Sequence, residues 1–471
     1  MKSHKLTFIL CLLILSCQSS RVNQTPEMDT VNKTDKTVIR KIFDEALTKG
    51  ECYENLRSLC KDIGHRLSGS PQADQAVEWG KNLMQEMGLD NVFLQEVMVP
   101  HWERGKREEI SIQLAAGEEK VSLPLCALGS SIGTPAEGIT AEIIEVQNFD
   151  ELAELGEEKV KGKIVFFNRP MNPKLINTFA AYGGCVNQRS QGASYAAKYG
   201  GVGALVRSMS LRHDDHPHTG VMWYNPKVSD KKVPGAAIST AAANQLSEML
   251  KKNPKLEASL VMDCKNFPDK KSYNVIGELR GSEFPEEYIV VGGHLDSWDK
   301  GEGAHDDGAG VVHSLEVVRL FLSMGIKPKR TIRVVLFMNE ENGAKGAAEY
   351  ARVAKEKNEN HLAALESDRG GFTPRGFTID ADSATILKVQ SWKPLLVPYG
   401  LHDIIPGYAG VDIKPLKGQG VKLFGYLPDS QRYFDHHHAD TDVFEAVNKR
   451  ELELGAASMA AFIYLIDKYG L

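Results

Sequence analysis

Several features are scarce in this sequence, and each absence excludes a class of protein. Seven cysteines among 471 residues are too few and too scattered for a disulfide-stapled miniprotein, and no CxxC pair is present to form a zinc ribbon or a thioredoxin motif. Neither sign of charge dominates: 56 lysines and arginines stand against 62 acidic residues. The resulting net charge of −6 excludes a strongly basic nucleic-acid footprint over the whole chain. The absence of an HExxH motif excludes the thermolysin-type single-zinc mechanism.

An apolar run does occur at the N-terminus. Two lysines precede the apolar residues 6–15, a stretch that is too short to span a membrane and is typical of a signal peptide. It ends in Ser16-Cys17, in a context that resembles the bacterial lipobox. We therefore expect residues 1–16 to be removed, Cys17 to carry a lipid, and residues 17–36 to form a flexible tether. The predicted location is the periplasm or the cell surface, and a plain secretory signal is the alternative.

The pattern of apolar and polar residues changes twice along the rest of the chain. Helical periodicity prevails from about residue 37, short β-type runs dominate over 107–268, and strands alternate with helices from 269 onward. Such alternation is typical of βαβ units and a mostly parallel sheet. The pattern over residues 107–268 instead predicts a separate α+β module rather than a continuation of that sheet. The elements expected in the last part are strands over Glu287–Val291, Thr331–Met338 and Leu362–Leu365, and helices over Asp307–Ser323 and Ala344–Lys357.

Residues that bind metals or move protons gather where these strands are expected to end. His294 and Asp296 follow the first strand, the Glu340-Glu341 pair follows the second, and Asp368 follows the third. Asp306 stands at the expected start of the first helix. Because active sites of such sheets lie beyond the carboxyl ends of the strands, these side chains should converge at one rim. Carboxylates gathered there would repel one another without a cation between them, which predicts a metal site.

The residue types favour zinc. Imidazole and carboxylate ligands without thiolates suit Zn²⁺, and there are enough for two ions that share one aspartate. Asp296 is too near His294 to bind the same ion and is better placed to hold the other ring nitrogen. One member of the Glu340-Glu341 pair can bind metal while the other faces the substrate as general base, because adjacent side chains of an extended segment diverge. Two ions about 3.5–4 Å apart would hold a hydroxide and polarise the substrate carbonyl.

The ordered series His294-x-Asp296, Asp306, Glu340-Glu341, Asp368 and a late histidine resembles the co-catalytic di-zinc exopeptidases of the bacterial leucyl aminopeptidase type. The resemblance covers nearly the whole mature chain. Its further stretches are Gly64–Ser70, Val99–Gly105 and, similar to a protease-associated insert, Val160–Phe167 and Pro217–Gly220.

This resemblance implies a fold and a set of roles. The implied fold class is α/β, with a mixed, mostly parallel sheet sandwiched by helices and interrupted by an α+β protease-associated-like domain. Residues 37–106 and 269–471 would form the catalytic domain, and 107–268 the insert. Two Zn²⁺ ions are implied, one held by His294, Asp306 and Asp368, and the other by Asp306, Glu341 and a C-terminal histidine. Glu340 would be the general base and Asp296 the orienting carboxylate.

Three adjacent histidines compete for the last ligand position. In the resembling enzymes the ligand stands four residues before an Asp-Thr pair, so that Asp440-Thr441 selects His436. The register of the family's final helix instead selects Asp442 and therefore His438. An extended segment would place His436 and His438 on one face and turn His437 away. We expect His438 to bind metal, with His436 as the alternative.

The predicted function is that of a di-zinc metalloexopeptidase acting on dipeptides and short peptides. Its amino- or carboxypeptidase polarity stays open, Cys17 is the only membrane attachment expected, no nucleic acid is expected, and a homodimer is considered. Two alternatives come from other classes. A binding protein on an inactive exopeptidase fold is disfavoured because every catalytic position is retained, and a single-zinc glutaminyl cyclase-like enzyme is disfavoured by the residues for a second metal.

Three smaller features of the sequence concern a serine nucleophile, a further metal site and a disulfide. Gly129–Gly133 fits the GxSxG pattern of serine hydrolases, but Thr134-Pro135 follows where that motif requires a helix. The His213–His218 cluster is expected to be a solvated loop rather than a third metal site. A disulfide between Cys52 and Cys60 stays open.

Overall fold

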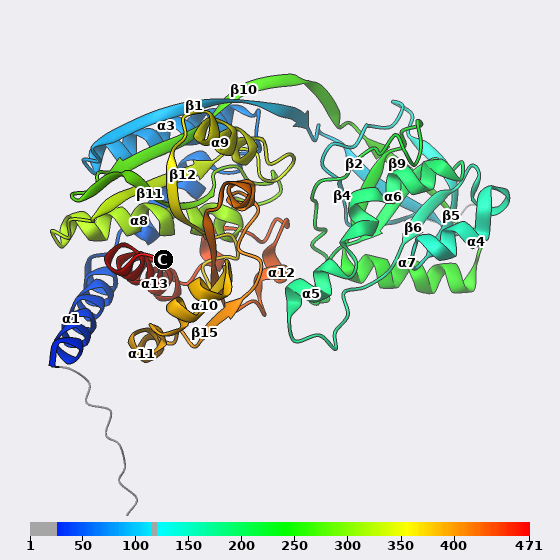
Figure 1. The fold of residues 1–471 in the computed structure, drawn as a ribbon. Helices are drawn as coiled ribbons and strands as arrows, with labels where there is room; N and C mark the ends of the chain where they lie inside the picture. Colours follow the sequence, from blue (N-terminus) through cyan, green and yellow to red (C-terminus); the bar gives the residue numbers. More distant parts are fainter. Residues whose placement is uncertain (1–25, 115–119) are drawn as a thin grey trace, which may run out of the picture.

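The computed structural model describes residues 26–114 and 120–471, which form two eight-stranded sheets (Figure 1). The predicted signal peptide over 1–16 and the predicted lipid site at Cys17 lie outside the described residues. Among the helices that the structure describes, none is both long and apolar enough to cross a membrane.

The helices are α1 (Pro26–Lys49), α2 (Cys52–Arg57), α3 (Pro71–Glu86), α4 (Phe149–Val160), α5 (Thr178–Gly183), α6 (Val186–Lys198), α7 (Thr240–Lys252), α8 (Ala309–Ser323), α9 (Lys345–Glu356), α10 (Ser383–Gln390), α11 (Lys393–Leu396), α12 (Tyr433–His436) and α13 (Lys449–Tyr469). Shorter or irregular helical turns are η1 (Ser58–Ile63), η2 (Ala304–Gly308), η3 (Val397–Tyr399), η4 (Lys414–Gln419) and η5 (Phe444–Ala446). The strands are β1 (Asn91–Glu103), β2 (Glu108–Gln113), β3 (Val121–Ser122), β4 (Leu125–Ala127), β5 (Ile139–Val146), β6 (Ile164–Phe167), β7 (Gly203–Arg207), β8 (Gly235–Ile238), β9 (Glu257–Met262), β10 (Lys265–Leu279), β11 (Phe284–His294), β12 (Arg330–Phe337), β13 (Asn360–Glu366), β14 (Pro374–Asp380), β15 (Asp403–Pro406) and β16 (Lys422–Pro428).

The first sheet has the order β1-β10-β12-β11-β13-β16-β14-β15. It is mixed: the run β12-β11-β13-β16 is parallel and β14 pairs parallel with β15, whereas the pairs β1–β10, β10–β12 and β16–β14 are antiparallel. The three strands expected from the sequence are the central β11, β12 and β13. This arrangement confirms the predicted α/β class with a mixed sheet.

Helices cover both faces of the first sheet. In β12, Ile332, Val334 and Leu336 pack into the cluster that contains α3, α8 and α13, whereas Val335 and Phe337 pack into the cluster that contains α9. Successive side chains of a strand point to opposite faces, so a strand covered on both sides is apolar at every position. Burial on two faces explains why the central strands read as continuous apolar runs.

The second sheet is built from residues 108–262 and has the order β3-β2-β9-β5-β6-β7-β8-β4. The chain enters it after β1 and leaves it before β10. These two long strands pair antiparallel from Asn91↔Glu278 to Glu103↔Lys265, with a shift of register between Val99 and His101. In Figure 1 they arch from the first sheet toward the second. One strand pair therefore carries both crossings of the chain between the two sheets.

Helix α1 corrects the predicted tether over residues 17–36. The helix begins at Pro26, so residues 26–36 are helical. The physical reason lies at Asp35, whose fully buried carboxylate accepts hydrogen bonds from Tyr464 (2.8 Å), Tyr469 and Lys468 of α13. A buried carboxylate with three donors fixes this part of the chain against the C-terminal helix.

The thiols of Cys52 and Cys60 are buried and unpaired. Cys52 instead donates to the carbonyl oxygen of Val312 in α8. The disulfide that the sequence left open is therefore not formed in this structure.

Candidate metal centre

Three strand ends and one helix start surround a common point. β11 ends at His294, Glu340 follows the end of β12, and Asp368 follows the end of β13. These strands are parallel neighbours, so their carboxyl ends share one edge of the sheet. Asp306 lies in η2, the helical turn that precedes α8.

His294, Asp306 and Asp368 form a first group of candidate ligands. Nε2 of His294 lies 3.2 Å from Oδ1 of Asp306 and 3.5 Å from Oδ1 of Asp368. Nδ1 of the same ring donates to the backbone carbonyl of Asp296 (2.9 Å), which leaves Nε2 as the lone-pair nitrogen facing the carboxylates. Nε2 of His294 and Oδ1 of Asp368 are buried without a hydrogen-bond partner.

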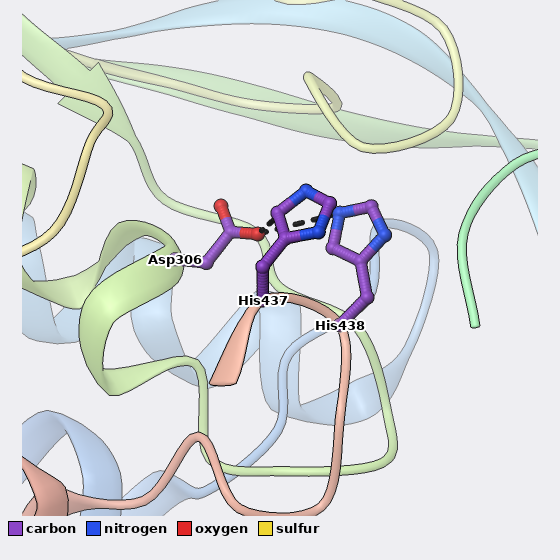
Figure 2. Close-up of side chains that lie close together, drawn as sticks. All are labelled: Asp306, His437 and His438. Atoms are coloured by element: carbon purple, nitrogen blue, oxygen red, sulfur yellow. Dashed lines mark ion pairs between the residues drawn. The ribbon is translucent and has the colours of Figure 1, made fainter. Parts of the chain in front are cut away.

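His438, Glu341 and Asp306 form a second group. Nε2 of His438 lies 3.3 Å from Oδ2 of Asp306 and 3.2 Å from Oε2 of Glu341. Its Nδ1 lies 3.3 Å from the carbonyl oxygen of Thr219, to which it donates. Figure 2 shows the Asp306 carboxylate directed at the histidine rings. Asp306 thus offers one oxygen to each group, as a bridging ligand would.

The spacing of these atoms fits zinc. Ligands about 2.0–2.1 Å from a tetrahedral zinc ion lie about 3.3 Å from one another. The four nitrogen–oxygen distances in the two groups are 3.2, 3.5, 3.3 and 3.2 Å. The donor set of imidazole and carboxylate without thiolate also suits this ion. The residues present therefore fit a pair of zinc ions that share Asp306.

The electrostatics of the site also favour bound cations. Burial raises the pKa of Glu340 to about 8; His294 opposes this shift, and the carboxylates of Asp368 and Asp306 add to it. Burial, reinforced by Asp306, raises the pKa of Glu341 well above its ordinary value. Burial also opposes ionisation of Asp306, but His294 and His438 hold its pKa well below the usual range. Several carboxyl groups in one buried place resist ionisation together, and a cation between them removes that penalty.

Two aspartates outside the ligand groups hold the backbone of the site. The carboxylate of Asp442 accepts hydrogen bonds from the backbone N–H of His305 (2.7 Å) and of Asp306 (3.1 Å). Asp307 accepts the backbone N–H of His294 (3.0 Å) and an N–H at the start of α8 (3.0 Å). Burial raises the pKa of Asp442 to about 7. These contacts tie the end of β11, the turn η2 and the C-terminal loop together.

Asp296 has a different contact from the one predicted. The sequence suggested that its carboxylate holds the second ring nitrogen of His294, but the nearer atom is its own backbone carbonyl, and its Oδ1 lies 3.9 Å from Nδ1. The carboxylate instead accepts the backbone N–H groups of Asn339 (2.7 Å), Glu340 (3.0 Å) and Glu341 (3.3 Å). Asp296 therefore positions the glutamate pair directly and His294 through its main chain.

The two adjacent glutamates have separate environments, as expected. Glu341 is almost fully buried, with Oε1 accepting the backbone N–H of Trp298 (3.2 Å) and Oε2 facing His438. Glu340 belongs to neither ligand group and lines the cavity beside them. One member of the pair thus faces the ligand atoms and the other faces open space.

The histidine run corrects the expected alternation. His436 ends α12, and its Nδ1 donates to the carbonyl of Thr441 (3.0 Å), away from the ligands. His437 does not turn away: its Nε2 lies 3.8 Å from Oδ2 of Asp306, and its ring stacks on that of His438 with centroids 3.5 Å apart (Figure 2). The segment is not extended, since His438 has a φ of 64°. The structure therefore brings His437 and His438 to Asp306 and leaves His436 outside.

The second sheet contributes directly to the site. Arg189 of α6 places Nη1 3.3 Å from Nδ1 of His438 and donates through Nη2 to the hydroxyl of Tyr182 (2.7 Å). His218, expected on a solvated loop, is buried and donates from Nδ1 to the carbonyl of His437 (2.7 Å). Burial lowers the pKa of His218 to about 4, so that it is a neutral positioning group.

A cavity of about 350 Å³ opens beside the ligand groups. This volume is at the small end of the range of small-molecule sites, about 300–1,000 Å³. Its wall joins the candidate ligands to aromatic side chains of α5, α12 and β16. The residues that line it are Phe179, Tyr182, Arg189, Val221, Asp306, Glu340, Glu341, Glu366, Asp368, Arg369, Tyr408, Ala409, Gly410, Val411, Tyr426, Tyr433, Phe434, His437 and His438.

Comparison with known proteins gives the same assignment as the geometry. A family model for peptidase family M28 matches residues 274–463. Carboxypeptidase Q of Bos taurus is 36% identical over 414 residues, which are 88% of this chain and 84% of the relative. The chain belongs to peptidase family M28. A crystal structure of a peptidase M28 precursor from Shewanella amazonensis has 32% identity and a TM-score of 0.88, covering 93% of this chain and 98% of that one.

M28 membership confirms the resemblance drawn from the sequence and makes the chain a metallopeptidase, hence a hydrolase. A zinc aminopeptidase from Bacillus subtilis shares the fold at 20% identity, with a TM-score of 0.63 and coverage of 90% of this chain and 97% of that one. The zinc exopeptidase fold predicted from the motif order is thereby confirmed.

The serine-hydrolase alternative has no support in this M28 structure. Ser131 is buried, its Oγ donates to the carbonyl of Ile132, and it accepts the N–H of Gly235. The next helix begins only at Phe149. No strand–nucleophile–helix elbow is formed at this GxSxG sequence.

Some site residues were not found from the sequence. Arg189, Tyr182 and Thr219 reach the M28 site from positions more than 200 residues before His438. No local pattern marks Arg189 or Tyr182, and Thr219 lies in the Pro217–Gly220 stretch, which the resemblance covered without assigning it a role. Arg66 is another: it is fully buried and donates to carbonyl oxygens in the segment that joins His294 to Asp306. Arg66 lies in the Gly64–Ser70 stretch, which the resemblance covered without assigning this arginine a role.

Proposed function

We propose that this chain is a di-zinc exopeptidase that hydrolyses dipeptides and short peptides. The supporting observation is the pair of ligand groups that share Asp306, with nitrogen–oxygen distances between 3.2 and 3.5 Å. The proposed ligands of one ion are His294, Asp306 and Asp368, and those of the other are Asp306, Glu341 and His438.

The chain's own groups supply the proton transfers. Bound zinc ions would polarise the scissile carbonyl and lower the pKa of the attacking water. Glu340 accepts a proton from that water and delivers it to the leaving amine, which is the general base and general acid role of a carboxylate that lines the cavity without belonging to a ligand group. Asp296 accepts the backbone N–H of Glu340 and so fixes where the base stands.

The size of the cavity and the relatives together favour short peptides. About 350 Å³ leaves room for a few residues at most, and aromatic side chains of α5, α12 and β16 enclose the space. The relatives include carboxypeptidase Q, which is a carboxypeptidase by name, and a zinc aminopeptidase that shares the fold. Exopeptidase action at one chain end is the common element of these names.

The test combines metal analysis with a peptide panel. We expect two zinc ions per purified chain, loss of hydrolysis on chelation, and recovery when zinc is returned. The panel contains dipeptides that are free, blocked at the amino end, or blocked at the carboxyl end. Full activity with one zinc per chain would favour the single-zinc alternative, and two bound zinc ions without hydrolysis of any peptide would favour a binding protein.

Three further assignments belong to the same proposal. The second sheet corresponds to a protease-associated-like insert over 107–268, between catalytic parts over 37–106 and 269–471. The chain is exported, residues 1–16 are removed and Cys17 is lipidated, as the N-terminal sequence favours. Mass spectrometry of the mature N-terminus tests the lipid, and a Cys17→Ala variant released from the membrane fraction would support it. Light scattering tests the homodimer.

A further inference from the structure

The cavity beside the ligand groups contains an arginine that no acidic side chain neutralises. Arg369 directly follows Asp368 and lines the cavity. Among residues 26–114 and 120–471, no carboxylate forms an ion pair with it. Its guanidinium donates one hydrogen bond, from Nη2 to the backbone carbonyl of Tyr408 (3.1 Å), and lies over the ring of Phe179, 5.1 Å from the centroid. Since a guanidinium has five N–H donors in a planar fork, most of them are free to bind a ligand.

The guanidinium of Arg369 is held in place from two sides. Tyr408 belongs to the loop 407–413, and the buried carboxylate of Glu366 anchors this loop by accepting the N–H groups of Val411 (2.9 Å) and Ile413 (2.9 Å). Phe179 reaches the same arginine from α5, which belongs to the second sheet's part of the chain. A cation fixed before the ligand arrives loses less side-chain entropy on binding.

Apart from Glu340, the carboxylates of the cavity are already engaged. Asp306, Glu341 and Asp368 belong to the ligand groups, and Glu366 holds the loop. Arg189, the second cavity arginine, donates through Nη2 to Tyr182 and has its Nη1 3.3 Å from Nδ1 of His438, while its Nε is buried without a partner. A negative group that enters the cavity therefore meets two arginines among the described lining residues, and Arg369 is the one that directly follows the candidate ligand Asp368.

We propose that Arg369 binds the free C-terminal carboxylate of the substrate and so makes the enzyme cleave next to a free carboxyl end. This specificity rests on the proposed peptidase function and deepens it. Asp368 and Arg369 line one wall of a small cavity, so a short peptide whose scissile carbonyl lies at the metal ligands brings its terminal carboxylate to the guanidinium. The planar fork matches a carboxylate with two parallel hydrogen bonds.

The test compares one dipeptide as the free acid and as its C-terminal amide, with zinc-loaded protein. Losing a charged hydrogen-bond pair costs about 10- to 100-fold in affinity, so wild type should prefer the acid by that factor in kcat/KM. In Arg369→Gln the acid-to-amide ratio should fall toward one, mainly through a higher KM for the acid. Arg369→Lys should restore part of the preference. The matched control Arg375→Gln, at an exposed arginine paired with Asp429, should keep the wild-type ratio.

Each other result overturns the assignment. An unchanged acid-to-amide ratio of kcat/KM in Arg369→Gln would show that Arg369 does not bind the carboxylate. Loss of the preference in Arg189→Gln, with two zinc ions retained and Arg369 intact, would move the role to Arg189. Wild type that favours the amide would reverse the polarity while leaving the peptidase function in place. Zinc-loaded wild type that hydrolyses neither form would refute the peptidase function itself, together with this proposal.

Discussion

Replacing the two adjacent glutamates one at a time should separate proton transfer from metal binding. Glu340→Gln and Glu341→Gln each remove one carboxylate at nearly the same place in the chain and with the same change of shape. In the structure, Glu341 faces His438 at 3.2 Å, whereas Glu340 lines the cavity outside both ligand groups. We expect Glu340→Gln to keep two zinc ions and lose turnover, and Glu341→Gln to lose one zinc ion.

The size of the Glu340 effect follows from its position. A general base contributes about 10²- to 10⁴-fold to the rate, which corresponds to roughly 3–5 kcal/mol of barrier. We expect the upper part of that range, because the other cavity carboxylates belong to ligand groups or, in Glu366, hold the backbone N–H groups of Val411 and Ile413. No second carboxylate among the described lining residues is free to take over the proton.

The assay is kcat on a free dipeptide, with zinc counted per chain in each protein. Glu340→Gln should lower kcat with little change in KM, since a base acts in the transition state more than in binding. Near-normal hydrolysis by Glu340→Gln would refute its role as base. Two tightly bound zinc ions in Glu341→Gln would refute the second ligand group, and a melting temperature equal to wild type would exclude misfolding as the cause of either loss.

The remaining predictions concern the last ligand, the loop between ligands, and pH. His438→Ala should lose one zinc per chain while His436→Ala keeps both, and metal analysis showing the reverse would assign the ligand to His436. Arg66→Met leaves two buried carbonyl acceptors and one part-buried acceptor without their donor, at about 1–3 kcal/mol for each buried one, so urea unfolding should show a loss of roughly 2 kcal/mol or more; a loss below about 1 kcal/mol would contradict this account. Burial, and after it the charge of Arg333, lowers the pKa of His361 to about 4, so the folded chain keeps this ring neutral while the unfolded chain takes up a proton below about pH 6.5. The contribution of His361 to the free energy of unfolding is therefore intact above pH 6.5 and falls by about 2 kcal/mol between pH 7.5 and 5. His361→Gln should lose that part of the pH dependence of stability. Equal changes of the unfolding free energy with pH in the two proteins would contradict the prediction.

The central strands and the convergence of their ends could be predicted from the sequence. β11, β12 and β13 are apolar on both faces because helices cover both, and a continuous apolar run bounded by polar residues is visible without a structure. Parallel neighbours then bring His294, Glu341 and Asp368 to one edge. Local pattern and a general rule of sheet topology suffice for this part of the site.

The contacts that orient the ligands could not be predicted in the same way. The expectation for His437 assumed an extended segment, but α12 ends at His436 and His438 takes a positive φ, so the alternation fails. The expectation for Asp296 assigned its carboxylate to His294, although the backbone carbonyl of the same residue reaches that ring first. Both errors concern one or two backbone dihedral angles after an element ends, which spacing in the sequence does not determine.

The second sheet completes the metal centre rather than merely covering it. For Nε2 of His438 to face Asp306 and Glu341 as a lone pair, Nδ1 must carry the proton and needs an acceptor; that acceptor is the carbonyl of Thr219, from the second sheet's part of the chain. Arg104, at the crossing from β1 to the second sheet, donates to Asp299 in the loop between His294 and Asp306, and also to the carbonyl of Ala127 (2.7 Å) in β4. One arginine thus connects the loop between His294 and Asp306 to a strand of the second sheet. Because a backbone carbonyl cannot be replaced by a side-chain substitution, the orientation of His438 depends on the fold of residues 108–262. Changes that loosen the second sheet should therefore weaken zinc binding at the proposed group of Glu341 and His438 before binding at the proposed group of His294 and Asp368.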